Sequence, residues 1–144
     1  MESFIPIFRM AHFVGLSMLL GGTLCSMALV HQEKPSQTTV KSAWNCIHLI
    51  ASPGLLLLII TGILQSAAVY WEHFKGAGYM HAKIAIVFAI FLFVIADMKT
   101  QKKALKNSQD QDLLLYSLKK RQIYAASNCV LVMVIMWLVS YRPF

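Results

Sequence analysis

The stretch "GAGYMHAKIAIVFAIFLFVIADMKTQKKALKN", residues 76–107, joins a long apolar run to a burst of lysines. An α-helix rises about 1.5 Å per residue, so about 20 apolar residues cross the hydrocarbon core of a bilayer. His81 and Lys83 stand at the start of this run, although polar residues in such segments are costly and usually have a function. The stretch therefore predicts a membrane helix and raises the question of what His81 and Lys83 do.

Other apolar segments of similar length accompany this one, and together they predict four membrane helices. Hydrophobic residues make up 58% of the 144 residues and charged residues only 13%, whereas a globular domain carries about 25% charged residues. The short connections leave no room for a second domain. We therefore expect an all-α fold, a single integral membrane four-helix bundle over residues 1–144 with helices at about 4–30, 44–69, 79–96 and 123–141.

The first segment also has features of a cleaved signal sequence, because Arg9 precedes an apolar run and "GGTLC" ends in a lipoprotein-like cysteine, Cys25. A small residue should precede such a cysteine, but Leu24 stands there, and Glu2 is acidic where signal sequences are basic. We therefore expect this segment to remain as the first membrane helix.

The placement of the basic residues accounts for the net charge of +7 without nucleic acid as a partner. Nine of them lie between the first and second or the third and fourth segments: Lys34, Lys41, Lys99, Lys102, Lys103, Lys106, Lys119, Lys120 and Arg121. Four lie elsewhere: Arg9, Lys75, Lys83 and Arg142. The positive-inside rule predicts cytoplasmic lysine-rich connections and both termini on the outer, periplasmic side of a bacterial inner membrane, with the lipid bilayer as the surrounding partner.

The cysteines lie in or beside apolar segments and form no CxxC motif: Cys25, Cys46 and Cys129. We expect packing thiols rather than disulfides, with metal ligation as the alternative. In the second segment, Ser42 is the expected N-cap, and Pro53 and Gly54 predict a kink or a close helix approach.

Pairs of glycines recur along the first two segments. Gly15 and Gly22 are two helical turns apart, and Gly54 and Gly62 have a similar spacing. Such faces admit either a neighbouring helix or a flat cofactor.

Two histidines, His12 and His81, are the strongest candidates for a site. Under the predicted topology both lie in the outer leaflet on different helices, which is how four-helix bundles hold a haem between two histidines. Gly15 and Ala85 follow them one turn inward and would leave room for a porphyrin. The alternative is that each histidine lies at the membrane interface, hydrogen-bonded to water or headgroups.

Arg9 and Lys83 are the cations nearest these histidines in sequence. Arg9 lies three residues before His12 on the same helical face, and Lys83 lies two residues after His81. Both could neutralise carboxylates at the outer surface, such as porphyrin propionates. The alternative for Lys83 is that its long side chain only reaches the interface.

A second histidine site and a copper site are two further alternatives. His31 and His48 lie near the inner ends of the first two helices, where an interfacial role is the simpler interpretation. Met80, Met133 and Met136 are soft ligands that suit Cu(I), but no methionine cluster stands in a water-exposed segment.

Motifs in a fixed order run along nearly the whole chain: Arg9 and His12, then "GGTLCSMALVHQ", Pro53 with "ITGIL", Tyr79 with His81 and Lys83, Arg121, and the terminal "YRPF". This layout resembles the HemJ-type protoporphyrinogen IX oxidases, within a wider set of CopD-like membrane proteins. The chain departs from that pattern in lacking a tryptophan before the first-helix glycine. It also has Tyr124 and Ala125 where the family has an Asn-Glu pair.

The resemblance implies haem b as cofactor, with His12 and His81 as iron ligands and with Arg9, Gly15 and Lys83 beside it. It implies oxidation of protoporphyrinogen IX to protoporphyrin IX, with Lys83 and Arg121 as catalytic cations and with quinone or another respiratory carrier as electron acceptor. The missing carboxylate keeps two alternatives open, a non-catalytic haem b electron carrier and a CopD-like copper-handling protein. Homo-oligomers are compatible with either.

Overall fold

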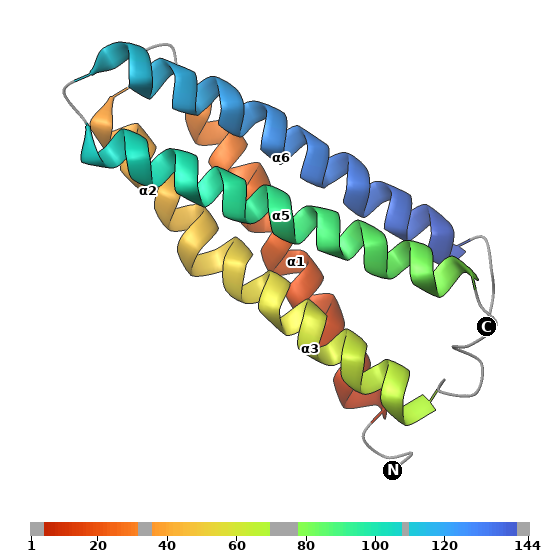
Figure 1. Cartoon of the computed structure of the whole chain (residues 1–144). Coiled ribbons are helices and arrows are strands. Elements are labelled where there is room, and N and C mark those ends of the chain that lie inside the picture. The colour runs from red at the N-terminus through yellow and green to blue at the C-terminus, as the bar shows by residue number, and fades with distance from the viewer. Residues whose placement is uncertain (1–4, 32–35, 70–77, 108–109, 141–144) are drawn as a thin grey trace.

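The computed structural model describes residues 5–31, 36–69, 78–107 and 110–140. The elements in these ranges are all helical, and they are α1 (Ile5–Val30), α2 (Gln37–Asn45), the π-helix η2 (Cys46–Ala51), α3 (Ser52–Val69), α5 (Gly78–Lys106) and α6 (Gln111–Ser140). Because α2, η2 and α3 follow one another without a break, the chain forms four rods that run side by side (Figure 1). The predicted all-α class is confirmed.

Three of the described helices are long and apolar enough to cross a membrane. They are Pro6–Val30, the joined α2, η2 and α3 over Gln37–Ala67, and His81–Lys106. The fourth predicted span, 123–141, lies in α6 and runs past the last described side chain, that of Trp137. The protein is therefore a multi-pass helical membrane protein by length and composition, and the fourth span stays a prediction.

The helices extend beyond the apolar runs that predicted them. Ser36 caps α2 by accepting a hydrogen bond from the Thr39 backbone N–H at 3.1 Å, so the prediction of Ser42 as the cap was wrong. The first turns of α2 bury Thr39, Val40 and Ala43 on one face, which stabilises helix outside the apolar run. Asp110 caps α6, accepting from the Leu113 N–H at 3.1 Å.

Pro53 is accommodated by the π-helix that precedes it. Proline donates no backbone hydrogen bond, and its ring collides with the carbonyl four residues earlier in a regular α-helix. In η2 each backbone hydrogen bond spans five residues instead of four, and the Ser52 N–H donates to the carbonyl of Ile47. The irregularity predicted from Pro53 therefore takes the form of a π turn that ends just before it.

The closest helix packing joins α1 to η2 and α3, while α5 lies along α6 (Figure 1). A Cβ at Gly15 would lie 2.9 Å from the Gly54 carbonyl oxygen, and one at Gly22 would lie 2.8 Å from Ala51. The two rods therefore touch backbone to backbone. The central core between all four rods is apolar and comprises Leu19, Ile47, Ala51, Leu55, Ile90, Val94 and Val132.

We expect Gly22→Ala to lower the free energy of unfolding by about 1–3 kcal/mol, because its methyl group has no room against η2. Gly21→Ala is the matched control, since a Cβ there meets nothing within 4 Å. The midpoint of thermal unfolding, followed by helical circular dichroism in detergent, should fall for Gly22→Ala alone. Equal midpoints for the two variants would contradict the backbone contact.

Candidate functional site

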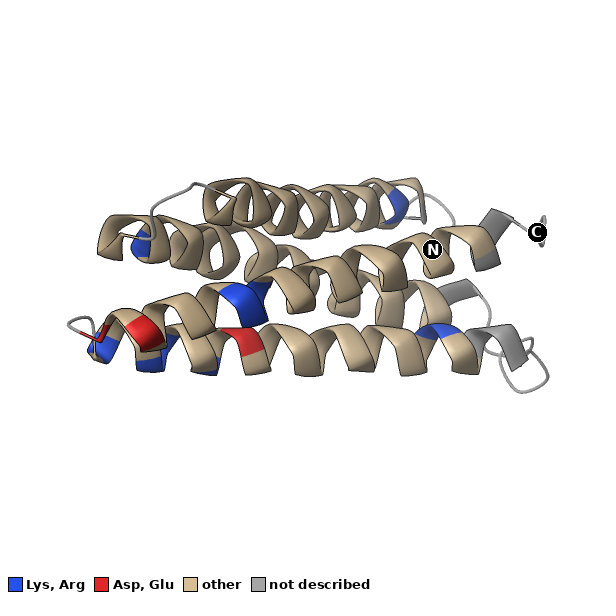
Figure 2. Ribbon diagram, turned by 90° about the horizontal axis from the view of Figure 1, so that it is seen from above, with Lys and Arg blue, Asp and Glu red and all other residues tan. Residues whose placement is uncertain are grey.

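The charged residues divide the bundle into two unlike ends (Figure 2). Most lysines lie where α1 and α5 end and α2 and α6 begin, which we call the lysine end. The opposite end, where α1 and α5 begin and α3 ends, we call the His12 end; Arg9, His12, His81 and Lys83 belong to it. The sequence prediction that these four residues share one end of the bundle is thus met by the helix order.

His12 is held by α3. Its Nδ1 lies 2.9 Å from the Thr61 hydroxyl oxygen, and Thr61 is buried with 3% of its surface exposed. The Thr61 hydroxyl has a single hydrogen, which it donates to the Leu57 carbonyl at 2.7 Å. With its hydrogen placed there, its oxygen can accept from the His12 Nδ1–H, in the tautomer whose Nε2 carries a free lone pair.

Gly62, on α3, lies beside the His12 ring and leaves room there for a methyl group. A Cβ at Gly62 would meet His12 Cε1 at 3.7 Å and no other described atom within 4 Å. One turn further along, Gln65 donates from Nε2 to the Phe8 carbonyl at 2.9 Å and ties α3 to α1 again. Two polar contacts on successive turns therefore hold His12 in place while Gly62 leaves room next to it.

The other predicted residues of this end differ in their exposure. His81 lies exposed in the first turn of α5, and Arg9 is exposed on α1. Lys83 is half-buried, and its charge lies within electrostatic range of His12. Among the described residues no three His, Cys, Asp or Glu side chains gather into a metal site. A haem held between two histidines needs no such group.

Gly15 has a packing role in the structure. A Cβ there would lie 2.9 Å from the Gly54 oxygen and 3.1 Å from Leu58, so α3 occupies the space that a flat cofactor would need. The open glycine is Gly62, which sequence analysis paired with Gly54 but did not place beside His12.

A second polar cluster lies inside the lysine end, around Arg121. The Arg121 side chain is wholly buried, donates from Nη2 to the Ala43 carbonyl and lies 4.0 Å from the Asp97 carboxylate. Gln101 donates from Nε2 to Asp97 at 3.4 Å and to the Ser117 carbonyl at 3.2 Å. This cluster joins α2, α5 and α6.

Sequence analysis singled out Arg121 but missed Asp97, whose signal was a carboxylate placed directly after an apolar run in "FVIADMK". Within the described residues, Arg121 Nε and Nη1, Gln101 Oε1 and Asn128 Oδ1 are buried without a hydrogen-bond partner. Arg121 is therefore an interior residue with spare hydrogen-bonding capacity.

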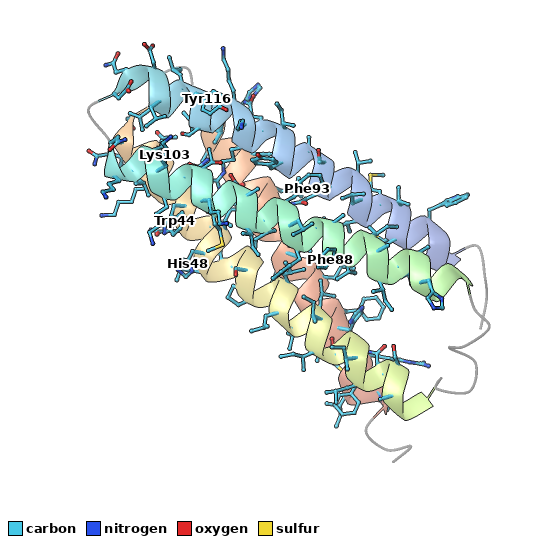
Figure 3. The ribbon with its side chains drawn as sticks, in the orientation of Figure 1. Trp44, His48, Phe88, Phe93, Lys103 and Tyr116 are labelled. Carbon is cyan, nitrogen blue, oxygen red and sulfur yellow. The ribbon has the colours of Figure 1, made fainter. Side chains whose placement is uncertain are left out.

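The remaining predicted ligands whose side chains the structure describes are exposed. His48 is exposed and stacks edge-on against Trp44 at 5.3 Å between ring centroids (Figure 3). His31 is exposed at the end of α1. Met133 and Met136 are 70% and 52% exposed, and the Met80 side chain lies outside the described residues. An outward position favours the simpler roles for these residues, at the interface or against lipid.

Fold and site together define a helical membrane protein with one polar cluster at each end of its bundle. The chain is similar to the protoporphyrinogen IX oxidase of Helicobacter pylori, with 28% identity over 95 residues. The match covers 66% of this chain and 60% of that relative, less than two thirds of its length. No family model matches the chain, and no solved structure does.

Proposed function

We propose that this chain is a membrane haem b protein of the HemJ type that oxidises protoporphyrinogen IX to protoporphyrin IX. Two findings support the proposal: the similarity to the Helicobacter pylori enzyme and the His12 site. We further propose an inner-membrane location with both termini periplasmic, in keeping with the lysines at the opposite end of the bundle.

The observation that carries the proposal is the hydrogen bond that joins His12 Nδ1 to the Thr61 hydroxyl. Iron-ligating histidines characteristically donate their other ring N–H to an acceptor, which orients the ring. His12 does so to Thr61 and presents a bare Nε2, and Gly62 leaves space beside the ring. An imidazole whose ring is held by a hydrogen bond through Nδ1 suits a haem ligand.

In this proposal His81 is the second ligand, and Arg9 and Lys83 meet the propionates at the His12 end. The haem would supply one-electron chemistry, taking electrons from the substrate side and delivering them to quinone or another respiratory carrier. The protein's own part is to orient the His12 ring, to hold positive charge at the outer surface and to keep the core between the rods dry.

A second function, a haem b electron carrier without catalysis, is favoured by the position of the acidic residues. Substrate oxidation releases protons, for which a nearby carboxylate is the usual acceptor. The described carboxylates, those of Asp97, Asp110 and Asp112, all lie toward the lysine end rather than beside His12. Tyr124 and Ala125 replace the family's Asn-Glu pair.

The absorption spectrum of the detergent-purified protein, before and after dithionite, tests the proposal. We expect a Soret band and, on reduction, sharp α and β bands typical of two histidine ligands. Colourless protein that takes up no added haemin would contradict it. Growth of cells that lack protoporphyrinogen oxidase then separates the two functions: rescue supports the enzyme, and failure with full haem loading supports the carrier.

A further inference from the structure

Two cysteines that are distant in sequence meet at the contact between α1 and η2. The Sγ atoms of Cys25 and Cys46 lie 3.2 Å apart, across 21 residues of chain. Both are free thiols. A disulfide bond is about 2.05 Å long, so the two sulfurs need to approach by about 1 Å to form one.

The backbone around this pair keeps the two thiols together. Gly22, one turn before Cys25, lies so close to η2 that a Cβ there would be 2.9 Å from the Cys46 carbonyl oxygen. Cys46 is the first residue of the π-helix, a feature that occurs often at functional sites. Cys129, in α6, has no sulfur within hydrogen-bonding distance in the part of the chain that the structure describes.

Cys25 is also accessible from the membrane. Its side chain is exposed on the surface of α1, inside the span Pro6–Val30, so it faces lipid. Lipid-soluble oxidants therefore reach the pair without entering the bundle. Arg121 donates to the carbonyl of Ala43, one turn before Cys46, so the Arg121 cluster lies next to the dithiol.

We propose that Cys25 and Cys46 form a reversible inter-helix disulfide, with a lipid-soluble quinone as the oxidant. Each thiol loses its hydrogen as the S–S bond forms, and the two electrons and two protons pass to the quinone, which becomes a quinol. The disulfide would fix η2 to α1 next to the Arg121 hydrogen bond. The inference stands on the α1–η2 contact alone and does not depend on haem.

The experiment uses the purified full chain in detergent, reduced and then freed of reductant. It is treated with a short-chain, fully substituted benzoquinone, which has no free ring position at which a thiol could add. Remaining thiols are blocked with N-ethylmaleimide, and the intact mass is measured. We expect three labels per chain before oxidation, because the chain has three cysteines, and one label after it, with quinol formed in equal amount.

Single cysteine-to-serine variants show which two cysteines form the disulfide. Cys25→Ser and Cys46→Ser should each keep both remaining thiols after quinone treatment, whereas Cys129→Ser should lose both of its thiols as the wild type loses two. Three labels on wild-type protein after quinone would overturn the oxidant, and three labels after the general thiol oxidant diamide would overturn the disulfide itself. A bond that includes Cys129, or one between two chains, would also overturn the assignment.

Discussion

Arg121→Met is expected to lower the free energy of unfolding by about 3–5 kcal/mol, since removing one partner of a buried ion pair leaves the other charged and unpaired in the interior. Asp97 would lose its positive neighbour while remaining only 3% exposed, and the Ala43 carbonyl would lose its side-chain donor. The midpoint of unfolding in a denaturing detergent, followed by circular dichroism, measures the loss.

Two further variants separate the ion pair from a general effect of losing a cation. The double variant Arg121→Met with Asp97→Leu removes both charges, so it should be less destabilised than the sum of the two single variants. Lys119→Met removes an exposed charge two residues away and should leave the midpoint unchanged. If Arg121→Met unfolds at the wild-type midpoint yet loses activity, Arg121 acts as a catalytic cation, as the resemblance implies.

The sequence was sufficient to predict the helical class and which ends of the helices lie together. Apolar runs long enough to span a bilayer and basic residues between them carry that information locally. The helix boundaries were less predictable because α2 and α5 continue past their apolar runs: Gln37 precedes the predicted start at 44, and Lys106 follows the predicted end at 96. In these extensions the helix buries apolar residues on one face only, so the sequence shows no continuous apolar run.

The sequence was sufficient to predict His12 as a site residue, but it did not reveal the residues that His12 contacts. An intramembrane histidine such as His12 is conspicuous in sequence, whereas its partner Thr61 lies 49 residues away and resembles any helical threonine. The same holds for the pairing of Cys25 with Cys46, and of Arg121 with Asp97. Spacing cannot reveal such contacts because they depend on which helices pack and at what depth.

The sequence also did not show which glycines pack against another helix and which leave room for a cofactor. Gly15 and Gly62 have the same apparent capacity to admit a cofactor, but α3 fills the space at Gly15, whereas a Cβ at Gly62 would make only ordinary contact with His12. Only the relative position of α1 and α3 distinguishes the two.

His12→Ala is expected to remove the Soret band of the purified protein, because it deletes the histidine that is hydrogen-bonded to Thr61 and lies beside Gly62. His48→Ala is the control for loss of a histidine as such, and its Soret band should match that of the wild type, since His48 faces outward against Trp44. Haemin titration of apo-protein in detergent, followed at the Soret maximum, gives the affinity of each variant. A full-strength band in His12→Ala would exclude His12 as a ligand.

Substitutions of Thr61 test the orienting hydrogen bond separately from the ligand. Loss of a residue that orients a metal ligand typically weakens metal binding about 10–100-fold, so Thr61→Val should raise the dissociation constant for haemin by that factor. Thr61→Ser keeps the hydroxyl that accepts from His12 Nδ1 and should bind haemin as the wild type does. Valine and threonine have nearly the same shape, so a loss confined to Thr61→Val reports on the hydrogen bond and not on packing. Equal affinities for the valine and serine variants would mean that Thr61 does not set the tautomer of His12.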